Sequence, residues 1–370
     1  MAAGLLLAAP AVKAAEVSDA ALAPIVAVHE SQDNVGLAVV FRDRDGLIVE
    51  QYVGDAVVEH EVPVTARSRF QVMSITKAFV GAALVKSLTA GRVALDAPVQ
   101  DYLPDYPRPE SGVITLRRLA AHTAGLPHLG HPDRRALYLE HFDTAAEALQ
   151  PFADLPLLFE PGTDYAYSSS NYNLIAAVLE TVYERPFPEV LNELVLTPLS
   201  LRATRPGNVN RPEPDLVRNY AWMDVWTYAP TDSLQQVPTW DFSYNVGGGN
   251  LVTTAPDLAR FGAAFLAPGF FSEAELALLH ARLDPEHSRW GFGWFVNEDG
   301  ADTWLSISGA TPGVQAGLAV YPSCGLVTVA LANAWGKNSA GGDLVIGAPR
   351  RAAAELVDCP SVLDADGARR

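Results

Sequence analysis

The strongest constraint on the fold is that β-rich segments occur near both ends of the chain and not in its middle. Near the start, residues 35–42 and 47–53 flank Asp43-Arg44-Asp45-Gly46, whose Asp-Gly step is typical of an antiparallel hairpin turn. Further β-rich segments follow much later, at residues 290–296, 303–308, 314–321 and 326–331. The pattern predicts an α+β fold: an antiparallel sheet flanked by helices, with an inserted and mainly helical region.

The expected domain boundaries follow from this pattern. Residues 20–94 and 245–360 should form the sheet domain, residues 95–244 the inserted helical domain, and residues 361–370 a tail. A chain of 370 residues is long for a single core.

The first residues resemble an export signal. Residues 1–15 contain a short apolar stretch followed by small residues near Ala14, although the usual basic start is missing. We expect an export signal or an unstructured tail here. The protein would then be periplasmic or secreted, and cytoplasmic if the segment is not a signal. No other apolar run approaches the ~20 residues of a membrane helix, so we expect no stable membrane span.

Composition narrows the possible partners. The net charge of -17 argues against nucleic acid or an anionic membrane surface, since both would repel the chain. The two cysteines, Cys324 and Cys359, do not cluster with histidines as metal ligands do, so no metal site is expected. They could form a disulfide in an exported protein or remain free thiols, and the sequence leaves both open.

Ser74 and Lys77 form the candidate reactive pair. They begin an apolar helical pattern and are three residues apart, so the hydroxyl and the amine should lie on the same side of the helix, one turn apart. A serine hydroxyl needs a base to take its proton, and a lysine amine can serve if burial disfavours its charged form. The alternative is a serine N-cap followed by an exposed lysine.

Two later loops could complete a catalytic cleft. The turn-rich segment 160–173 includes Tyr165 and Tyr167, and the segment 306–313 consists mostly of small residues beside which a substrate could lie. A serine–lysine hydrolase needs a second proton-handling group and two N–H donors for the oxyanion. His122 invites a Ser-His interpretation, but we expect it to pack or to bond within its loop.

The three segments resemble the boxes of the serine β-lactamase and penicillin-binding-protein superfamily in order and spacing. They read Ser74-Ile75-Thr76-Lys77, Pro161-Gly162-Thr163 through Tyr167-Ser168-Ser169, and Ile307-Ser308-Gly309-Ala310-Thr311-Pro312-Gly313. The chain is most similar to the class C-like branch, which includes family VIII carboxylesterases and LACTB-type serine hydrolases. The resemblance covers about residues 25–357 and implies a β-lactamase/transpeptidase-like fold.

The resemblance also implies roles for single residues. Ser74 would be the acylated nucleophile, Lys77 the group that helps to deprotonate it, and Tyr167 the phenol that relays protons, with Tyr165 as the fallback. The N–H groups of Ser74 and Ala310 would bind the oxyanion. Substrate would also contact three residues of the second and third boxes: Ser169, Ser308 and Gly309.

The sequence departs from the family pattern at two positions. Ser169 stands where the second box usually has asparagine, and Ile307 stands where the third box has lysine or histidine. Without that cation, a substrate carboxylate loses an electrostatic partner. A neutral ester or an internal peptide bond therefore suits this cleft better than a β-lactam.

The sequence thus predicts a serine hydrolase acting through an acyl-enzyme on an ester, amide or peptide, without a metal or organic cofactor. A β-lactamase or D,D-carboxypeptidase is the first alternative. A non-catalytic member that keeps the fold for binding or assembly is the second. Nothing in the sequence sets the oligomeric state.

Overall fold

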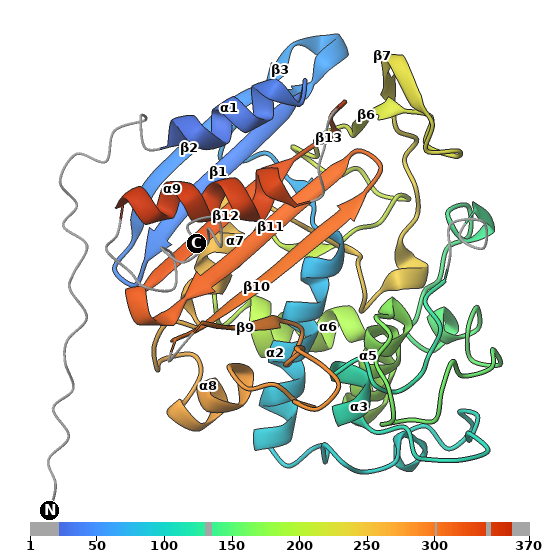
Figure 1. Cartoon of the computed structure of the whole chain (residues 1–370). Coiled ribbons are helices and arrows are strands. Elements are labelled where there is room, and N and C mark those ends of the chain that lie inside the picture. The colour runs from blue at the N-terminus through green and yellow to red at the C-terminus, as the bar shows by residue number, and fades with distance from the viewer. Residues whose placement is uncertain (1–21, 130–134, 300–301, 338–341, 357–370) are drawn as a thin grey trace, which may run out of the picture.

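A computed structural model describes residues 22–129, 135–299, 302–337 and 342–356 (Figure 1). Its main element is an antiparallel sheet with the strand order β3-β2-β1-β12-β11-β10-β9. The strands are β1 (Gly36–Asp43), β2 (Leu47–Val57), β3 (Val62–Pro63), β9 (Phe295–Asp299), β10 (Asp302–Thr311), β11 (Val314–Tyr321) and β12 (Leu326–Ala332). The N-terminal hairpin joins the late strands where β1 pairs with β12. The expected α+β fold with an antiparallel sheet is confirmed.

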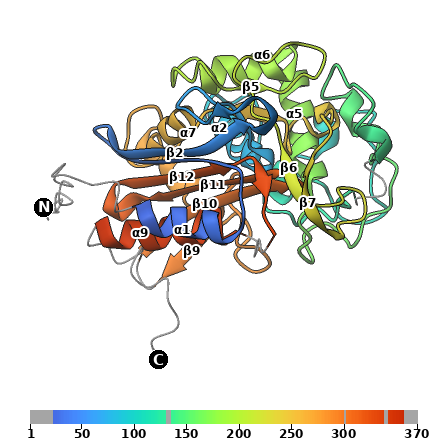
Figure 2. The ribbon, with the colours of Figure 1, turned by 90° about the horizontal axis from the view of Figure 1, so that it is seen from above.

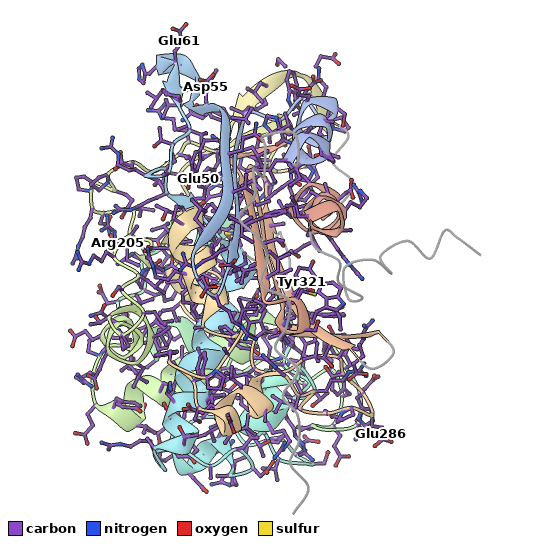
Figure 3. All side chains as sticks on the ribbon, turned by 90° about the vertical axis from the view of Figure 1, so that its left-hand side faces the viewer. Glu50, Asp55, Glu61, Arg205, Glu286 and Tyr321 are labelled. Atoms are coloured by element: carbon purple, nitrogen blue, oxygen red, sulfur yellow. The ribbon has the colours of Figure 1, made fainter. Side chains whose placement is uncertain are left out.

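Helices cover both faces of this sheet (Figures 2 and 3). One face packs against α1 (Ala23–Ser31), α9 (Ala348–Leu356) and a π-helical turn at Asp343–Gly347. The other face packs against α7 (Ala255–Ala263), and α2 (Thr76–Thr89) and α8 (Glu273–Leu279) belong to the same apolar core. The sheet therefore separates two apolar cores. Helix α2, which begins just after Ser74, lies in the larger core.

Helix α2 is buried on nearly every side. Its residues from Thr76 to Val85 are all buried, as expected for a helix that other elements surround. Glycines allow the closest contacts: a Cβ at Gly81 would lie 2.0 Å from the carbonyl oxygen of Phe292, and one at Gly293 would lie 2.1 Å from that of Lys77. Gly293 also has a φ of +83°, which favours glycine.

The segment 95–244 contains more sheet than expected. Its described helices include α3 (Leu116–Ala120), α5 (Ser169–Tyr183) and α6 (Phe187–Leu191), but it also provides β5 (Arg205–Pro206), β6 (Tyr220–Met223) and β7 (Pro230–Gln236). β6 lies between β7 and β13 (Ala334–Trp335), and β5 pairs with β8 (Leu251–Thr253), which also pairs with β4 (Phe70–Gln71). The expectation of a middle without sheet was wrong, because pairing with distant strands decides these short segments. The domain division itself stays a prediction.

The strand expected at residues 290–296 starts later, at Phe295. The reason is that Gly291 and Gly293 bring this stretch against the backbone of neighbouring segments, which a regular strand would not do. Similarly, the last helix, expected over residues 343–357, begins with the π-helical turn before α9.

Three expectations concern the ends of the chain. Residues 1–15 and the tail 361–370 lie outside the described residues. Cys324 is disulfide-bonded, and Cys359 also lies outside the described residues. In the described part of the chain, no helix has the length and apolar character needed to cross a bilayer.

His29 should make folding sensitive to acid. This α1 side chain is 4% exposed, and burial lowers the pKa of its ring from 6.5 to about 4. Between these pH values the unfolded chain binds more protons than the folded one, so the free energy of unfolding should fall by up to roughly 3 kcal/mol as pH drops from 6.5 to 4. Urea unfolding at pH 7.5, 5.5 and 4 measures this loss.

The matched variants are His29→Gln and His60→Gln, the latter at an exposed histidine. His29→Gln should remove most of this acid dependence, and His60→Gln should keep it. Equal acid dependence in the wild type and His29→Gln would contradict the assignment.

Candidate active site

Ser74 is presented by a tight turn between β4 and α2. It lies in a 3₁₀ turn, Met73–Ile75, and its side chain lines a cavity of about 710 Å³. Met73 has a φ of +45°, a left-handed conformation that is uncommon for a residue with a side chain. Ser74 does not cap α2: the N-cap position is Ile75, which makes no side-chain cap bond. The N-cap interpretation therefore does not fit the structure.

Lys77 lies under this turn and is completely buried. Its Nζ is 3.0 Å from Ser74 Oγ, 3.0 Å from Ser169 Oγ and 2.6 Å from the carbonyl oxygen of Gly248. The alternative of an exposed lysine is excluded by this burial. Lys77 is instead held by three oxygen atoms in the interior, one of which belongs to the candidate nucleophile.

Tyr167 is the phenol closest to this pair. Its hydroxyl is 2.6 Å from Ser74 Oγ, and its ring centre is 5.0 Å from Lys77 Nζ. The fallback residue Tyr165 lies elsewhere, since its hydroxyl accepts a hydrogen bond from Trp290 Nε1 at 3.1 Å. The structure thus brings Ser74, Lys77 and Tyr167 together and does not bring Tyr165 to them.

Burial and proximity shift both titrating groups. Burial lowers the pKa of the Lys77 ammonium below its usual value, and Tyr167 offsets only part of this effect. Burial also raises the pKa of the Tyr167 phenol. The charge of Lys77 and the hydrogen bonds to Tyr167 outweigh it, so that this pKa lies below its usual value. Both groups can therefore lose a proton at a lower pH than they would in water.

The contacts of Lys77 allow proton transfer from Ser74. The Gly248 carbonyl can only accept, so it takes one N–H of Lys77 whatever the charge on the amine. A neutral amine has one further N–H and a lone pair, and the lone pair can accept from a neighbouring hydroxyl, Ser74 among them. The geometry therefore permits Ser74 O–H to donate to Lys77 Nζ, the arrangement that deprotonates a serine nucleophile.

Two positioning elements, the Gly248 carbonyl and Asn173, were missed by sequence reasoning. The Asn173 Oδ1 accepts from the N–H groups of Gly247 and Gly248 at 3.0 and 3.1 Å, and its Nδ2 donates to the Tyr244 carbonyl at 3.0 Å. This buried side chain fixes the glycine loop whose carbonyl holds Lys77. A backbone carbonyl leaves no residue signature, but Asn173 follows Ser169 by four residues and so lies on the same face of α5.

His122 has the packing role expected from the sequence. It is fully buried, and its Nδ1 lies 3.2 Å from the backbone N of Ser168 and 2.9 Å from Asn171 Nδ2. Burial holds the pKa of its ring well below the usual value. Its ring centre lies 4.7 Å from those of Tyr167 and Trp290. His122 therefore supports the wall that carries Tyr167.

Strand β10 forms the opposite wall. Ile307, Ser308 and Ala310 line the same cavity as Ser74, with Ser308 and Ala310 exposed and Ile307 only 3% exposed. A Cβ at Gly309 would lie 2.0 Å from the Val72 carbonyl oxygen and 2.9 Å from the Ser74 backbone N. Gly309 thus brings β10 against the turn that presents Ser74, and the two backbones meet at the cavity.

The requirements of a metal site are also not met by the described residues. Among residues 22–129, 135–299, 302–337 and 342–356, no group of three or more His, Cys, Asp or Glu side chains could hold a metal ion.

Comparison with known proteins identifies the family of this chain. The Beta-lactamase family model matches residues 19–346. The chain belongs to the beta-lactamase family. The resemblance expected from the three boxes is thereby confirmed.

Two relatives illustrate the similarity of this chain to known proteins. The serine beta-lactamase-like protein LACTB, mitochondrial, of Homo sapiens is 26% identical over 335 residues, which cover 70% of this chain and 59% of LACTB. Esterase EstB of Burkholderia gladioli is 27% identical over 296 residues, covering 70% of this chain and 74% of EstB. The chain thus spans little more than half the length of human LACTB.

A solved structure shows the same fold. The octameric penicillin-binding protein homologue from Pyrococcus abyssi superimposes with a TM-score of 0.76 at 19% sequence identity, covering 90% of this chain and 76% of that chain. At this identity the likeness concerns the fold alone. Membership of the beta-lactamase family therefore establishes the fold, whereas the substrate depends on the residues that line this cavity.

Proposed function

We propose that the protein is a serine hydrolase that cleaves an ester or amide bond through an acyl-enzyme on Ser74. The observation that carries the proposal is the contact of Ser74 Oγ with both Lys77 Nζ and Tyr167 OH, at 3.0 and 2.6 Å, in the wall of a cavity. Two groups with lowered pKa values thus flank one hydroxyl.

In the acylation step, Ser74 Oγ attacks the substrate carbonyl carbon and its proton passes to Lys77. The N–H groups of Ser74 and Ala310 bind the oxyanion that forms. The bond to the leaving group then breaks, and the leaving oxygen or nitrogen takes the proton through Tyr167. Water next attacks the carbonyl carbon of the acyl ester. Its proton passes through Tyr167 and Lys77 to Ser74 Oγ as the bond between the acyl group and Ser74 breaks. The products are a carboxylic acid and the free Ser74 hydroxyl.

The substrate is best described as a neutral ester or an internal peptide bond. Ile307, which is only 3% exposed, provides no cation at the point of the cavity where a carboxylate would need one. β9 pairs with residues 302–306 of β10 only, which leaves residues 307–311 as an edge along which an extended substrate can lie. Similarity to an esterase, EstB, supports the same choice. Export of the protein remains part of the proposal.

Labelling with a fluorophosphonate tests the proposal. Intact-mass measurement should show one adduct on the wild type and none on Ser74→Ala. Equal labelling of the two proteins would contradict the assignment of Ser74 as the nucleophile. No adduct on the folded wild type would favour a non-catalytic member of the fold.

The pH dependence follows from the lowered pKa values. The base must be unprotonated to act, so kcat/KM for p-nitrophenyl butyrate should rise with pH and level off below the usual pKa of lysine near 10.5. Initial rates between pH 5 and 10, corrected for spontaneous hydrolysis, measure this profile. A rise that continues unchanged to pH 10 would show that Lys77 titrates like a lysine in water.

Nitrocefin separates the proposal from a β-lactamase or a D,D-carboxypeptidase. A charge-assisted hydrogen bond contributes roughly 1.5–3 kcal/mol, so its loss at Ile307 should lower kcat/KM for a carboxylate substrate about 10- to 100-fold. We therefore expect kcat/KM for p-nitrophenyl butyrate to exceed that for nitrocefin when both are measured on one preparation. Faster turnover of nitrocefin would reverse the choice of substrate.

A further inference from the structure

The cavity beside Ser74 has an unequal distribution of charge. Among the described residues that line it, Asp343 is the only charged side chain. Most of the remaining lining is apolar or aromatic and includes Trp290, Phe295, Ile307 and Ile346. The described lining thus offers one carboxylate, which is paired with Arg351, and apolar surface, while the Arg289 guanidinium lies behind this lining against the Phe295 ring.

Asp343 is held in place by Arg351, which follows it by eight residues in the same helical segment. Arg351 Nη1 is 2.8 Å from Asp343 Oδ1, and Arg351 Nη2 is 3.1 Å from Oδ2. Gly347 makes room for this pair, since a Cβ there would lie 2.4 Å from Asp343 Oδ1. Asp343 and Gly347 begin and end the π-helical turn, a conformation often found at functional sites. Each carboxylate oxygen retains a lone pair for a ligand in the cavity.

Tyr167 and Asp343 line the same cavity, so a leaving group that is protonated through Tyr167 lies in the cavity that Asp343 borders. Tyr167 lines the cavity and, in the proposed mechanism, passes a proton to the leaving group. The leaving group must therefore enter the same cavity. Aromatic rings there can attract a cation, and Phe295 already has the Arg289 guanidinium 5.0 Å from its ring centre.

We infer that the leaving group of the substrate carries an ammonium group beside an apolar part, and that Asp343 binds the ammonium. This inference rests on the proposed function and adds the chemical class of the leaving group. The overall charge of -17 acts in the same direction, because it draws cations toward the protein and repels anions.

Two esters of equal shape test the inference. Butyrylcholine has a quaternary ammonium, and 3,3-dimethylbutyl butyrate has a carbon atom in its place. A partly desolvated cation beside a carboxylate and an aromatic ring should raise kcat/KM for butyrylcholine about tenfold over the neutral ester. A wild-type ratio of one or less would overturn the inference without any variant.

Variants then assign the effect to one side chain. Asp343→Asn should bring the ratio close to one. Asp232→Asn, at an exposed position on β7, changes the net charge equally and should keep the tenfold ratio. An unchanged ratio in Asp343→Asn would remove Asp343 from the inference.

Labelling of Ser74 distinguishes failure of the inference from failure of the proposed function. If fluorophosphonate labels Ser74 but the cationic ester has no advantage, only the inference falls. If Ser74 is not labelled, the proposed function falls with it. If Ser74 is labelled but neither ester turns over, protection of Ser74 from labelling by choline is compared with that by 3,3-dimethylbutanol. Equal protection then overturns the inference.

Discussion

Lys77→Met should lower kcat/KM for p-nitrophenyl butyrate by about 10³-fold, and the rate of Ser74 labelling by a fluorophosphonate by a similar factor. The expected size is that of losing a positioned general base, about 10²–10⁴-fold. Lys77 Nζ is 3.0 Å from Ser74 Oγ, and it is also held by Ser169 Oγ, the Gly248 carbonyl and Tyr167. No other lysine lies in that contact to replace it.

Two further variants separate the base from the charge. Lys77→Arg keeps a cation but cannot give up its proton at accessible pH, so it should be as inactive as Lys77→Met. Lys337→Met, at a partly exposed lysine that pairs with Asp33, should retain wild-type activity. Full labelling of Ser74 in Lys77→Met would show that Tyr167 alone deprotonates the serine.

The sheet could be predicted where pairing is local or where strands are strongly apolar. The Asp-Gly turn predicts the β1–β2 hairpin, and β11 and β12 are mostly apolar and buried along their whole length. β7 could not be found in this way, because its sequence Pro-Thr-Asp-Ser-Leu-Gln-Gln is polar and partly exposed. It belongs to a sheet completed by β13, about a hundred residues later, so only the folded chain decides its conformation.

The candidate site shows the same division between local and distant information. The spacing of Ser74 and Lys77 within one helical turn was enough to place them together. Tyr167 required the resemblance to a family, since Tyr165 has the same chemistry two residues away. The spacing of Ser169 and Asn173 places both on one face of α5, but the contacts of Asn173 and of the Gly248 carbonyl depend on how α5 and the glycine loop pack on α2.

Gly309→Ala should lower kcat/KM about 10²-fold or more. The added methyl group would lie 2.0 Å from the Val72 carbonyl oxygen and 2.9 Å from the Ser74 backbone N, so β10 must move away from the turn that presents Ser74. The proposed oxyanion donors, on Ser74 and Ala310, come one from each of these two segments. A displacement of about 1 Å between them is enough to cost about 10²-fold in rate.

A clash of this kind also lowers stability, so the activity has to be compared with a matched variant. In Gly36→Ala, on β1, the added Cβ would lie 2.5 Å from the Asp55 carbonyl oxygen, far along the sheet from β10. Gly269→Ala meets no atom within 4 Å and serves as the neutral control. Gly36→Ala should lower the thermal midpoint but keep kcat/KM for the folded fraction, whereas Gly309→Ala should lose both. If Gly309→Ala keeps kcat/KM when folded, the oxyanion site cannot depend on the contact between β10 and the Ser74 turn, and the N–H of Ala310 loses its assigned role.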